Sequence, residues 1–583
     1  MILLWEGEST MSENAATLEN SAIERIFAER KDFIIVGLTG RTGCGCSTVA
    51  KLLCKNFDEL QPPRPSGSDS IAERQYKNIY EYAKSTWTPF RLIEMKHIIF
   101  TFILENDFHA LTEFINSTFN KNDIDLSGLE ASYTELYHKR AKWKKVVYEC
   151  TSNGENIPAD DELYKFYFED IPKYYSKFQN AISPLLYTKL LQIIGDNIRA
   201  SGHAFSSEVA PKNILNLAQR VNMLIKILRR RNIVEKKRVL VVIDALRNPY
   251  EATFFKDRYS AFYLFAINTT DVERRNRLIQ AGQTYENIGA LDKKEYPSLN
   301  NTIHDFYQIN IEKTIEIADV YINNKDSVSK NFSETKSQLI RYISLIMHPG
   351  LVSPTPIEYC MQVAYDSKLN SGCLSRQVGA AISDRDYNII STGWNSVPDG
   401  QIPCNLRSLL SIIRDDDEDN AGMSQFERTD DKFKDFLKSK VGHVDFSLLN
   451  GRNCAYCFKD AYNAYKEQKN QVHTRSIHAE EMAFLQASKI GAPPVRGGYL
   501  FTTASPCELC SKKAYHTGIS KIFYIDQYPG ISYKHILNCG NNTPEMVPFY
   551  GAIGRAYTQL YTQILPYKDE LYMLLGLTFK EKS

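Results

Sequence analysis

The sequence predicts an α/β protein of two domains, each built around its own β-sheet. Three observations support this prediction. Apolar strand-like runs alternate with helical segments between residues 31 and 348, and a break at His348-Pro349-Gly350 ends that region. A second series of strands and helices begins at residue 355 and carries closely spaced His, Glu and Cys residues. A chain of 583 residues has room for about two or three domains with proper cores.

The first domain is expected to begin after a polar lead-in over residues 1–30, in which Met11 is an alternative start to Met1. An apolar strand at residues 33–38 leads into a glycine-rich loop and then a helix at 49–57. Strand, glycine-rich loop and helix are the setting that a phosphate-binding loop requires. The candidate nucleotide or phosphate ligands are Gly40, Gly43, Gly45, Ser47, Thr48 and, at the end of a later strand, Asp244.

The lysine position of that loop holds Cys46. Backbone amides and the helix N-terminus still favour phosphate there, but the positive charge that reaches the outer phosphates is missing. Arg41 and Lys51 are the candidate replacements. We therefore expect nucleotide or phosphate binding without phosphoryl transfer. The alternative is a glycine-rich turn that serves the fold alone.

Further strands are expected at residues 238–244, 262–267 and 318–323. Asp271–Arg277 resembles the arginine-bearing lid helix of nucleoside monophosphate kinases, and the alternative is a solvated, charged helix face. Alternating strands and helices predict a parallel sheet with crossover helices. The region 31–348 thus resembles a P-loop nucleoside-kinase-like domain. A helical insertion at about 60–235 interrupts this domain. We expect the insertion to serve self-association or to act as a lid, and we expect the protein to form a homo-oligomer.

The second domain is expected over residues 355–583. Its predicted elements are helices at 357–368 and 478–489, strands at 378–383, 388–393, 498–502 and 522–525, and a helix beginning near Cys507. An insertion interrupts it at about 401–474. Helices at 554–565 and 569–575 are expected to cover one face of the sheet.

A catalytic zinc site is the strongest chemical prediction. His478, Cys507 and Cys510 offer one imidazole and two thiolates, which leaves a fourth tetrahedral position for water. Such a water loses a proton near neutral pH and becomes a nucleophile. Glu480, two residues from the histidine, is placed to carry protons. His-x-Glu followed by Pro-Cys-x-x-Cys is typical of zinc nucleobase deaminases. The alternatives are a structural zinc ribbon and two unrelated thiols.

The segments Ser375–Ala380 and Gly393–Asn395, together with the zinc motifs, resemble the deoxycytidylate deaminase family. With its first domain, the whole chain resembles the bacterial antiphage deaminases that act on dCTP and dCMP. The resemblance implies a cytidine-deaminase-like three-layer αβα fold, a small deoxycytidine nucleotide as substrate, and depletion of the dCTP pool in antiphage defence. It also implies that Asn395 contacts the deoxyribose and that Glu480 is the proton shuttle.

A second, structural zinc is implied by the same resemblance, because phage dCMP deaminases carry one. Its ligands include positions that resemble Cys373, Cys404 and His473, and Cys457 or Cys454 would complete a set of four. A closed tetrahedral site would hold the insertion in place. The alternative is a group of buried free thiols.

Charge, apolar content and cysteine positions limit the kinds of molecule that this protein is expected to bind. The 70 basic and 69 acidic residues leave a net charge of +1, so nucleic acid is not the expected substrate. The sequence has no run of about 18 apolar residues, so no membrane span is expected. Eight of the twelve cysteines lie from Cys360 onward, near histidines, which favours metal binding in a reducing cytosol. The competing functions are an RNA- or DNA-editing cytosine deaminase, a nucleotide sensor that gates the deaminase domain, and a nucleotide kinase.

Overall fold

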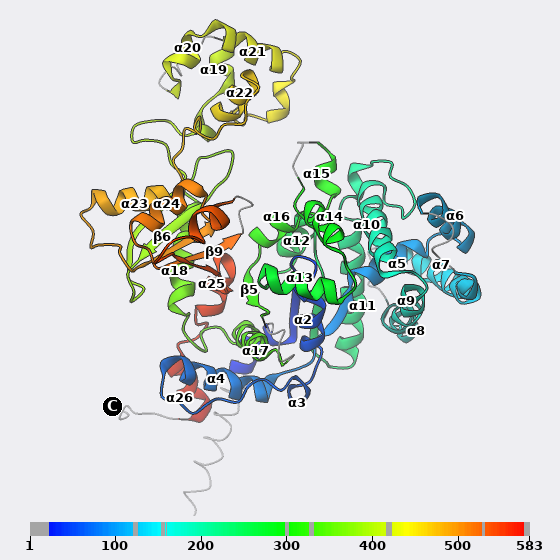
Figure 1. Cartoon of the computed structure of the whole chain (residues 1–583). Helices are drawn as coiled ribbons and strands as arrows, with labels where there is room; N and C mark the ends of the chain where they lie inside the picture. Colours follow the sequence, from blue (N-terminus) through cyan, green and yellow to red (C-terminus); the bar gives the residue numbers. More distant parts are fainter. Residues whose placement is uncertain are drawn as a thin grey trace, which may run out of the picture. The chain divides into compact units, whose positions relative to one another are not determined.

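The computed structural model describes residues 22–28, 30–119, 126–152, 158, 160–297, 302–325, 331–414, 422–526 and 531–576. Most of the expected lead-in therefore lies outside the described residues. The chain divides into two compact units, one of residues 1–353 with 558–583 and one of residues 354–557 (Figure 1). Among the helices described, none is long and apolar enough to cross a membrane.

Five strands of the first unit form a parallel sheet in the order β5-β4-β1-β3-β2. The residues of β1, β3, β4 and β5 are almost all buried, as expected of strands covered on both faces, whereas only Ile93 is buried in the edge strand β2. The strands are β1 (Phe33–Thr39), β2 (Arg91–Glu94), β3 (Val239–Asp244), β4 (Phe262–Asn268) and β5 (Val320–Asn323). The parallel sheet predicted for this region is thus present.

Helices connect these strands and extend beyond them. They are α2 (Cys46–Leu53), α3 (Phe57–Leu60), α4 (Ile71–Thr86), α5 (Met95–Ile103), α6 (Phe108–Thr118), α7 (Glu130–Ser152), α8 (Asp161–Lys165), α9 (Ile171–Asn180), α10 (Pro184–Ser201), α11 (Asn216–Val234), α12 (Pro249–Arg258), α13 (Asp271–Gln280), α14 (Tyr285–Glu295), α15 (His304–Tyr307), α16 (Ile311–Glu316), α17 (Ser333–Met347) and α26 (Tyr567–Leu575).

Two expectations for this unit need correction. The insertion expected at about 60–235 is not wholly helical, because Arg91–Glu94 is a strand that pairs with β3 and the helix α5 begins at Met95. A strand of four residues is too short to show the alternating pattern of a strand, and the apolar helical residues directly after it hide its end. The tail helix α26 groups with the first unit, where Glu570 lies 2.8 Å from His348 Nε2, rather than with the second unit to which the sequence assigned it.

The second unit has a mixed sheet in the order β10-β9-β8-β6-β7. Strand β6 is antiparallel to both β7 and β8, whereas β8, β9 and β10 are parallel. The elements are β6 (Gly379–Ser383), β7 (Ile389–Trp394), β8 (Tyr499–Ala504), β9 (Lys521–Asp526), β10 (Glu545–Pro548), β11 (Gly551–Ala552), α18 (Pro356–Lys368), α19 (Leu409–Arg414), α20 (Gln425–Thr429), α21 (Asp431–Val441), α22 (Phe458–Tyr465), α23 (Ala479–Lys489), α24 (Glu508–His516) and α25 (Gly554–Tyr561), which crosses the division between the units.

Two glycines show how helices cover both faces of this sheet. A Cβ on Gly379 would lie 2.0 Å from the Ala364 carbonyl oxygen of α18, and a Cβ on Gly393 would lie 2.2 Å from the Ala479 carbonyl oxygen of α23. Gly393 pairs with Ala380, the neighbour of Gly379, so the two glycines face opposite sides. The layers are therefore α18, sheet, and α23 with α24, as the αβα prediction requires.

The insertion 401–474 forms its own small cluster of helices. Its buried residues include Leu409, Ile412, Phe433 and Leu437, which pack around one apolar centre. At its edge, Arg407 is fully buried and pairs with Glu427 and the hydroxyl of Tyr456. A charge so deeply buried needs such partners to be tolerated.

Candidate active site

Two helix N-termini bring the predicted zinc ligands together. His478 is the N-cap of α23 and Cys507 is the N-cap of α24, with Cys510 in the first turn of α24. Both first turns contain acidic residues, which suits the positive end of a helix dipole. Lys513 on α24 pairs with Glu481 on α23 and links the two helices.

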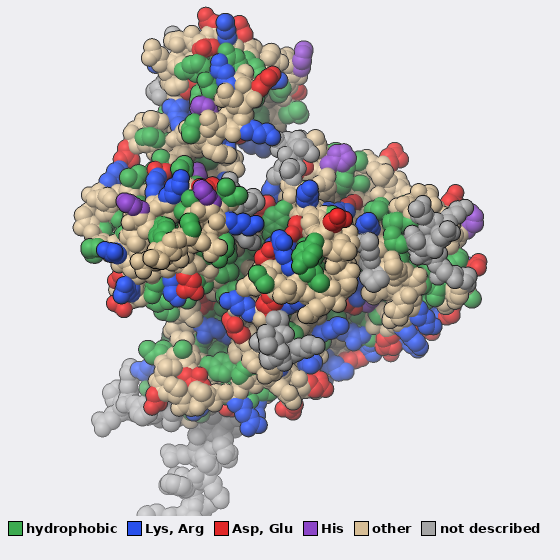
Figure 2. Space-filling model, viewed as in Figure 1, with side chains coloured by type: hydrophobic (Ala, Val, Ile, Leu, Met, Phe, Trp, Pro, Cys, Tyr) green, Lys and Arg blue, Asp and Glu red, His purple; other side chains and the backbone are tan. Residues whose placement is uncertain are grey.

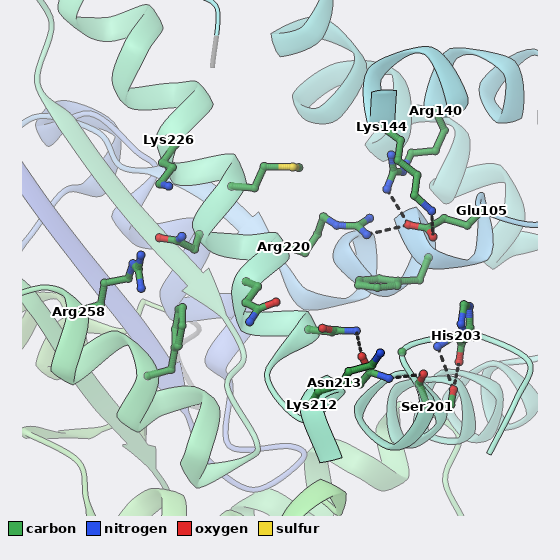
Figure 3. A pocket seen from close by; sticks show the side chains of 17 residues that line it. Glu105, Arg140, Lys144, Ser201, His203, Lys212, Asn213, Arg220, Lys226 and Arg258 are labelled. Carbon is green, nitrogen blue, oxygen red and sulfur yellow. Dashed lines mark hydrogen bonds and ion pairs between the residues drawn. The ribbon is translucent and has the colours of Figure 1, made fainter. Parts of the chain in front are cut away.

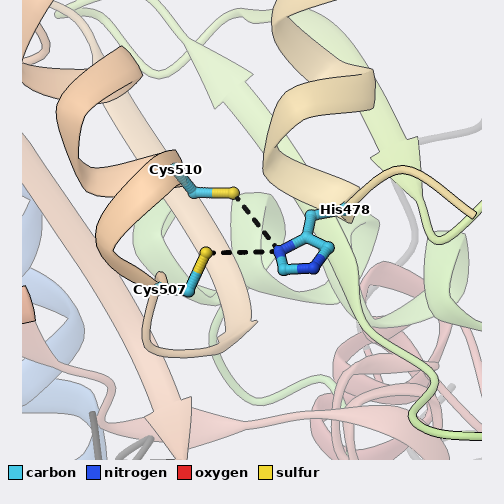
Figure 4. Close-up of side chains that lie close together, drawn as sticks. All are labelled: His478, Cys507 and Cys510. Atoms are coloured by element: carbon cyan, nitrogen blue, oxygen red, sulfur yellow. Dashed lines mark hydrogen bonds between the residues drawn. The ribbon is translucent and has the colours of Figure 1, made fainter. Parts of the chain in front are cut away.

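The three side chains converge on one point, as Figure 4 shows. The Nδ1 atom of His478 lies 3.3 Å from the Cys507 sulfur and 3.6 Å from the Cys510 sulfur. Zinc–nitrogen and zinc–sulfur bonds of about 2.1 and 2.3 Å in a tetrahedron separate N from S by about 3.6 Å. The donor set and its spacing therefore fit a zinc ion. Among the described residues, these three are the group whose potential ligand atoms lie within 4.8 Å of one another.

The pKa values of the two cysteine thiols in this cluster differ strongly from the usual value of a thiol. Hydrogen bonds from Cys510 and His478 hold the pKa of Cys507 down to about 3, against the opposing effect of burial. The pKa of Cys510 is raised, first by its hydrogen bond to Cys507 and then by burial. Cys507 is thus a ready thiolate, and a metal ion would replace the proton that Cys510 donates.

Glu480 lies next to this cluster and is 4% exposed. Burial raises the pKa of its carboxyl group, while His478 and a hydrogen bond from Cys510 lower it. The hydroxyl of Thr502 on β8 lies 3.3 Å from Glu480 Oε1 and 2.7 Å from the Ala504 carbonyl oxygen. Glu480 is therefore buried beside the three predicted ligands, a position that suits the proton-transfer role predicted for it. The sequence does not predict the contact with Thr502. The available signal is its position at the end of the predicted strand 498–502, shortly before the Cys507 loop.

Asn395 follows β7 and is buried. Its Oδ1 accepts a hydrogen bond from the Val378 amide at 2.6 Å, and its carbonyl oxygen accepts one from the Ser371 hydroxyl at 3.0 Å. The residue thus fixes the start of β6. Contact between its side-chain amide and a deoxyribose stays a prediction.

The residues suggested for a second zinc are brought together only in part. Burial raises the pKa of Cys404, Arg407 lowers it, and Cys457 and Cys373 raise it further, so these three thiols are neighbours. The ring of His473 packs against Tyr462 at 4.7 Å, and Cys454 packs against the apolar centre of the insertion. No three of the five predicted ligands have ligand atoms within 4.8 Å of one another in the described chain. The choice between Cys457 and Cys454 as the fourth ligand stays a prediction.

The glycine-rich loop joins β1 to α2 as predicted. Gly45 caps α2 with a φ of 99°, and a Cβ there would lie 2.2 Å from the Asn324 side-chain amide. Ser47 donates a hydrogen bond to the buried Asp244, the acid at the end of β3. Ser47 and Asp244 also line a cavity of about 280 Å³.

Acidic side chains of the first unit already bind some of the loop groups that would otherwise contact a phosphate. The Thr42 amide donates to Glu295 Oε1 at 3.0 Å, where a phosphate oxygen would be expected in a phosphate-binding loop. Arg41 pairs with Asp271 and Asp292, and Lys51 is exposed, so neither takes the place of the missing lysine. Lys96 and Arg247 line the cavity instead. Burial raises the pKa of Cys46 well above its usual value, so the lysine position carries no charge.

Comparison with known proteins finds deaminase relatives for the part of the chain that carries this site. Residues 354–526 match the model of the "Cytidine and deoxycytidylate deaminase zinc-binding region". The chain is 29% identical to the deoxycytidylate deaminase of Enterobacteria phage T2 over 173 residues, which are 29% of this chain and 78% of that protein. It is 29% identical to the phage T4 enzyme over 168 residues, 29% of this chain and 76% of that protein. It is also 41% identical to ComE operon protein 2 of Bacillus subtilis (strain 168) over 54 residues, 9% and 28% of the two chains. Residues 354–526 therefore resemble the zinc-binding region of cytidine and deoxycytidylate deaminases, and these matches support a hydrolytic deaminase.

Proposed function

We propose that this protein hydrolyses the 4-amino group of free deoxycytidine nucleotides, dCMP and dCTP, and releases ammonia. The observation that carries the proposal is the convergence of His478, Cys507 and Cys510, with the buried Glu480 beside them. The phage proteins that match this region are named deoxycytidylate deaminases, which supports a nucleotide as the substrate.

His478, Cys507 and Cys510 would hold the zinc, which supplies a water activated for attack near neutral pH. Glu480 accepts a proton from that water and delivers it to N3 of the cytosine ring. Glu480 then takes the second proton from the hydroxyl now bonded to C4 and passes it to the amino group. The C4–N bond breaks, ammonia leaves and the C4 carbonyl forms, so one carboxylate serves as base and acid in turn. The dry surroundings of Glu480 keep bulk water out of both transfers.

A single-strand editing deaminase is the runner-up. Editing enzymes need basic surfaces that follow the phosphate backbone. On the face that Figure 2 shows, Lys and Arg side chains lie among Asp and Glu side chains rather than forming one large patch. The balanced net charge agrees with this picture and favours free nucleotides.

A substrate panel tests the proposal. Zinc-loaded protein is incubated with deoxycytidine, dCMP, dCTP, CTP and a cytosine-containing oligonucleotide, and the uracil products are separated and counted. dCMP or dCTP is expected to be converted fastest. Conversion of the oligonucleotide alone would replace the proposal with the editing function.

The first unit is proposed to regulate this activity through its glycine-rich loop, and the biological role is proposed to be dCTP depletion during phage infection. Uncontrolled loss of a DNA precursor would harm the host, so the activity needs a signal. Nucleotide pools are measured in infected cells that carry the wild-type chain or Glu480→Ala. Lower dCTP, higher dUMP or dUTP and lower phage yield are expected with the wild type alone. Equal pools and equal phage yield would refute the defence role.

A further inference from the structure

A second cavity, of about 730 Å³, lies in the first unit and is separate from the glycine-rich loop. Its walls come from α5, α7, α11, α12 and the turn that follows α10 (Figure 3). We call it the cationic cavity and define it by its charged residues. These are Glu105, Arg140, Lys144, Lys212, Arg220, Lys226 and Arg258. Small-molecule sites have volumes of about 300–1,000 Å³, so the size fits a nucleotide.

Charge is the unusual property of this cavity. Six lysine and arginine side chains line it against one carboxylate, although the whole chain has a net charge of only +1. The six cations come from α7, α11, α12 and the turn at Lys212. Residues so far apart in sequence, gathered around one hollow, create a local positive potential that composition does not reveal.

The single carboxylate is shared by three cations. Glu105 lies 2.7 Å from Arg140, 2.7 Å from Arg220 and 2.7 Å from Lys144. Burial raises the pKa of Glu105, but Arg220 and Arg140 lower it more, to about 2. One negative charge does not neutralise three positive charges, so an excess remains inside the cavity wall.

That excess is partly desolvated. The side chains of Arg140 and Arg220 are 4% and 13% exposed. Burial lowers the pKa of Arg220, and repulsion from Arg140 lowers it further. The cations of a solvated basic helix face would keep their contact with water and would not lose this hydration. Buried charge without sufficient counter-charge is a feature of binding sites.

The remaining cations are available to a ligand. Lys212, Lys226 and Arg258 are exposed, and within the described part of the chain none of them forms an ion pair with an acidic side chain. In Figure 3, Lys226 and Arg258 lie across the hollow from Arg140, Lys144 and Glu105. A ligand with several negative charges would therefore meet cations on opposite walls.

Amide side chains line the space between these cations. Asn216, Gln219 and Asn222 follow one another on α11, and Asn213 precedes them. Asn213 donates to the Ser201 carbonyl oxygen at 2.5 Å, and Asn222 accepts from the Tyr259 hydroxyl at 2.5 Å. These amides are thus held in position, and amides suit the polar edges of a base or sugar.

We propose that the cationic cavity binds a nucleoside polyphosphate, with its phosphates between the two basic walls and its nucleoside against the amides of α11. The site is distinct from the zinc site and from the glycine-rich loop. It therefore stands even if the proposed substrate of the deaminase is wrong. The polyphosphate chain is the shared chemistry of a nucleotide and of inorganic tripolyphosphate, and the experiment separates the two.

Calorimetric titration of the full-length, zinc-loaded protein with ATP, GTP, inorganic tripolyphosphate and a short oligothymidylate tests the proposal. ATP or GTP is expected to bind more tightly than tripolyphosphate and more weakly as salt rises. The double variant Lys212→Glu, Lys226→Glu is expected to weaken nucleotide binding by about tenfold or more. Both lysines are exposed, so unfolding temperature and deamination without added nucleotide are expected to stay unchanged.

The matched control is Lys173→Glu, Lys177→Glu, two exposed lysines on α9 that change the net charge equally and lie outside the cavity. It is expected to bind nucleotide as the wild type does. Equal binding by the cavity variant and the wild type would overturn the proposal, as would an equal loss in both double variants. Oligothymidylate binding without nucleotide binding would also overturn it, in favour of a nucleic-acid surface. Tripolyphosphate binding as tight as ATP would remove the nucleoside from the proposal.

Discussion

At the scale of single residues, the proposed mechanism assigns metal binding and proton transfer to different side chains. His478, Cys507 and Cys510 supply the donor atoms, whereas Glu480 is two residues away and contacts the cluster without offering the same geometry. Neighbours in sequence therefore have different tasks. Glu481, which follows Glu480 directly, pairs with Lys513 and has a structural task.

Cys507→Ala is expected to abolish both bound zinc and deamination, because two remaining ligands bind zinc much more weakly than three. The measurement is metal content per chain after dialysis, together with dCMP turnover. Cys539→Ala is the control, since Cys539 is exposed and outside the ligand group. A Cys507→Ala protein that kept its full zinc content and activity would refute the assigned ligand set.

At the scale of elements, the site depends on how closely α23 packs on the sheet. His478 and Glu480 sit at the start of that helix, and Gly393 of β7 lets the helix backbone approach. A Cβ at residue 393 would lie 2.2 Å from the Ala479 carbonyl oxygen and 2.4 Å from the Ala483 amide. The backbone atoms there have no room to move aside cheaply.

Gly393→Ala is therefore expected to destabilise the second unit by about 1–3 kcal/mol, as overpacking does, and to lower turnover by displacing α23. Thermal unfolding and dCMP deamination measure the two effects. Gly422→Ala is the matched control, because its Cβ would meet nothing closer than 3.5 Å. Unchanged stability and activity in Gly393→Ala would contradict this packing account.

The insertion is the second element-scale test. Because Cys373, Cys404 and Cys457 are neighbours, a structural zinc is expected in addition to the catalytic one. Metal analysis should then find about two zinc ions per chain, and Cys404→Ser, Cys457→Ser should retain about one and unfold more easily. Cys454→Ser is the control and should keep both ions. A double variant with an unchanged metal count would remove the second zinc.

Much of this organisation was predictable from the sequence. The buried strands β1, β3 and β4 are long apolar runs, and the zinc ligands follow a fixed spacing. The short strand β2 was missed because four residues show no clear period. The cationic cavity was also missed, because Arg140, Arg220 and Arg258 belong to three helices that only the tertiary fold brings together.

At the scale of the whole molecule, the first unit is expected to bind phosphate groups without transferring them. The uncharged Cys46 stands at the lysine position, and Glu295 already accepts a hydrogen bond from the Thr42 amide. Phosphoryl transfer needs a cation that stabilises the transferred group. Incubation with radiolabelled ATP and dCMP is expected to yield no labelled diphosphate, while an authentic nucleoside monophosphate kinase run alongside does. Robust labelling would contradict this reading of the loop.

The central claim is that zinc held by His478, Cys507 and Cys510 works with Glu480 to deaminate a deoxycytidine nucleotide. The most direct measurement compares dUMP formation from dCMP by the wild type, Glu480→Ala and Glu481→Gln, with zinc counted in each sample. The account predicts full zinc in all three, near-normal turnover in Glu481→Gln, and a loss of about 10³-fold or more in Glu480→Ala. More than about a tenth of wild-type turnover in zinc-loaded Glu480→Ala would contradict the account.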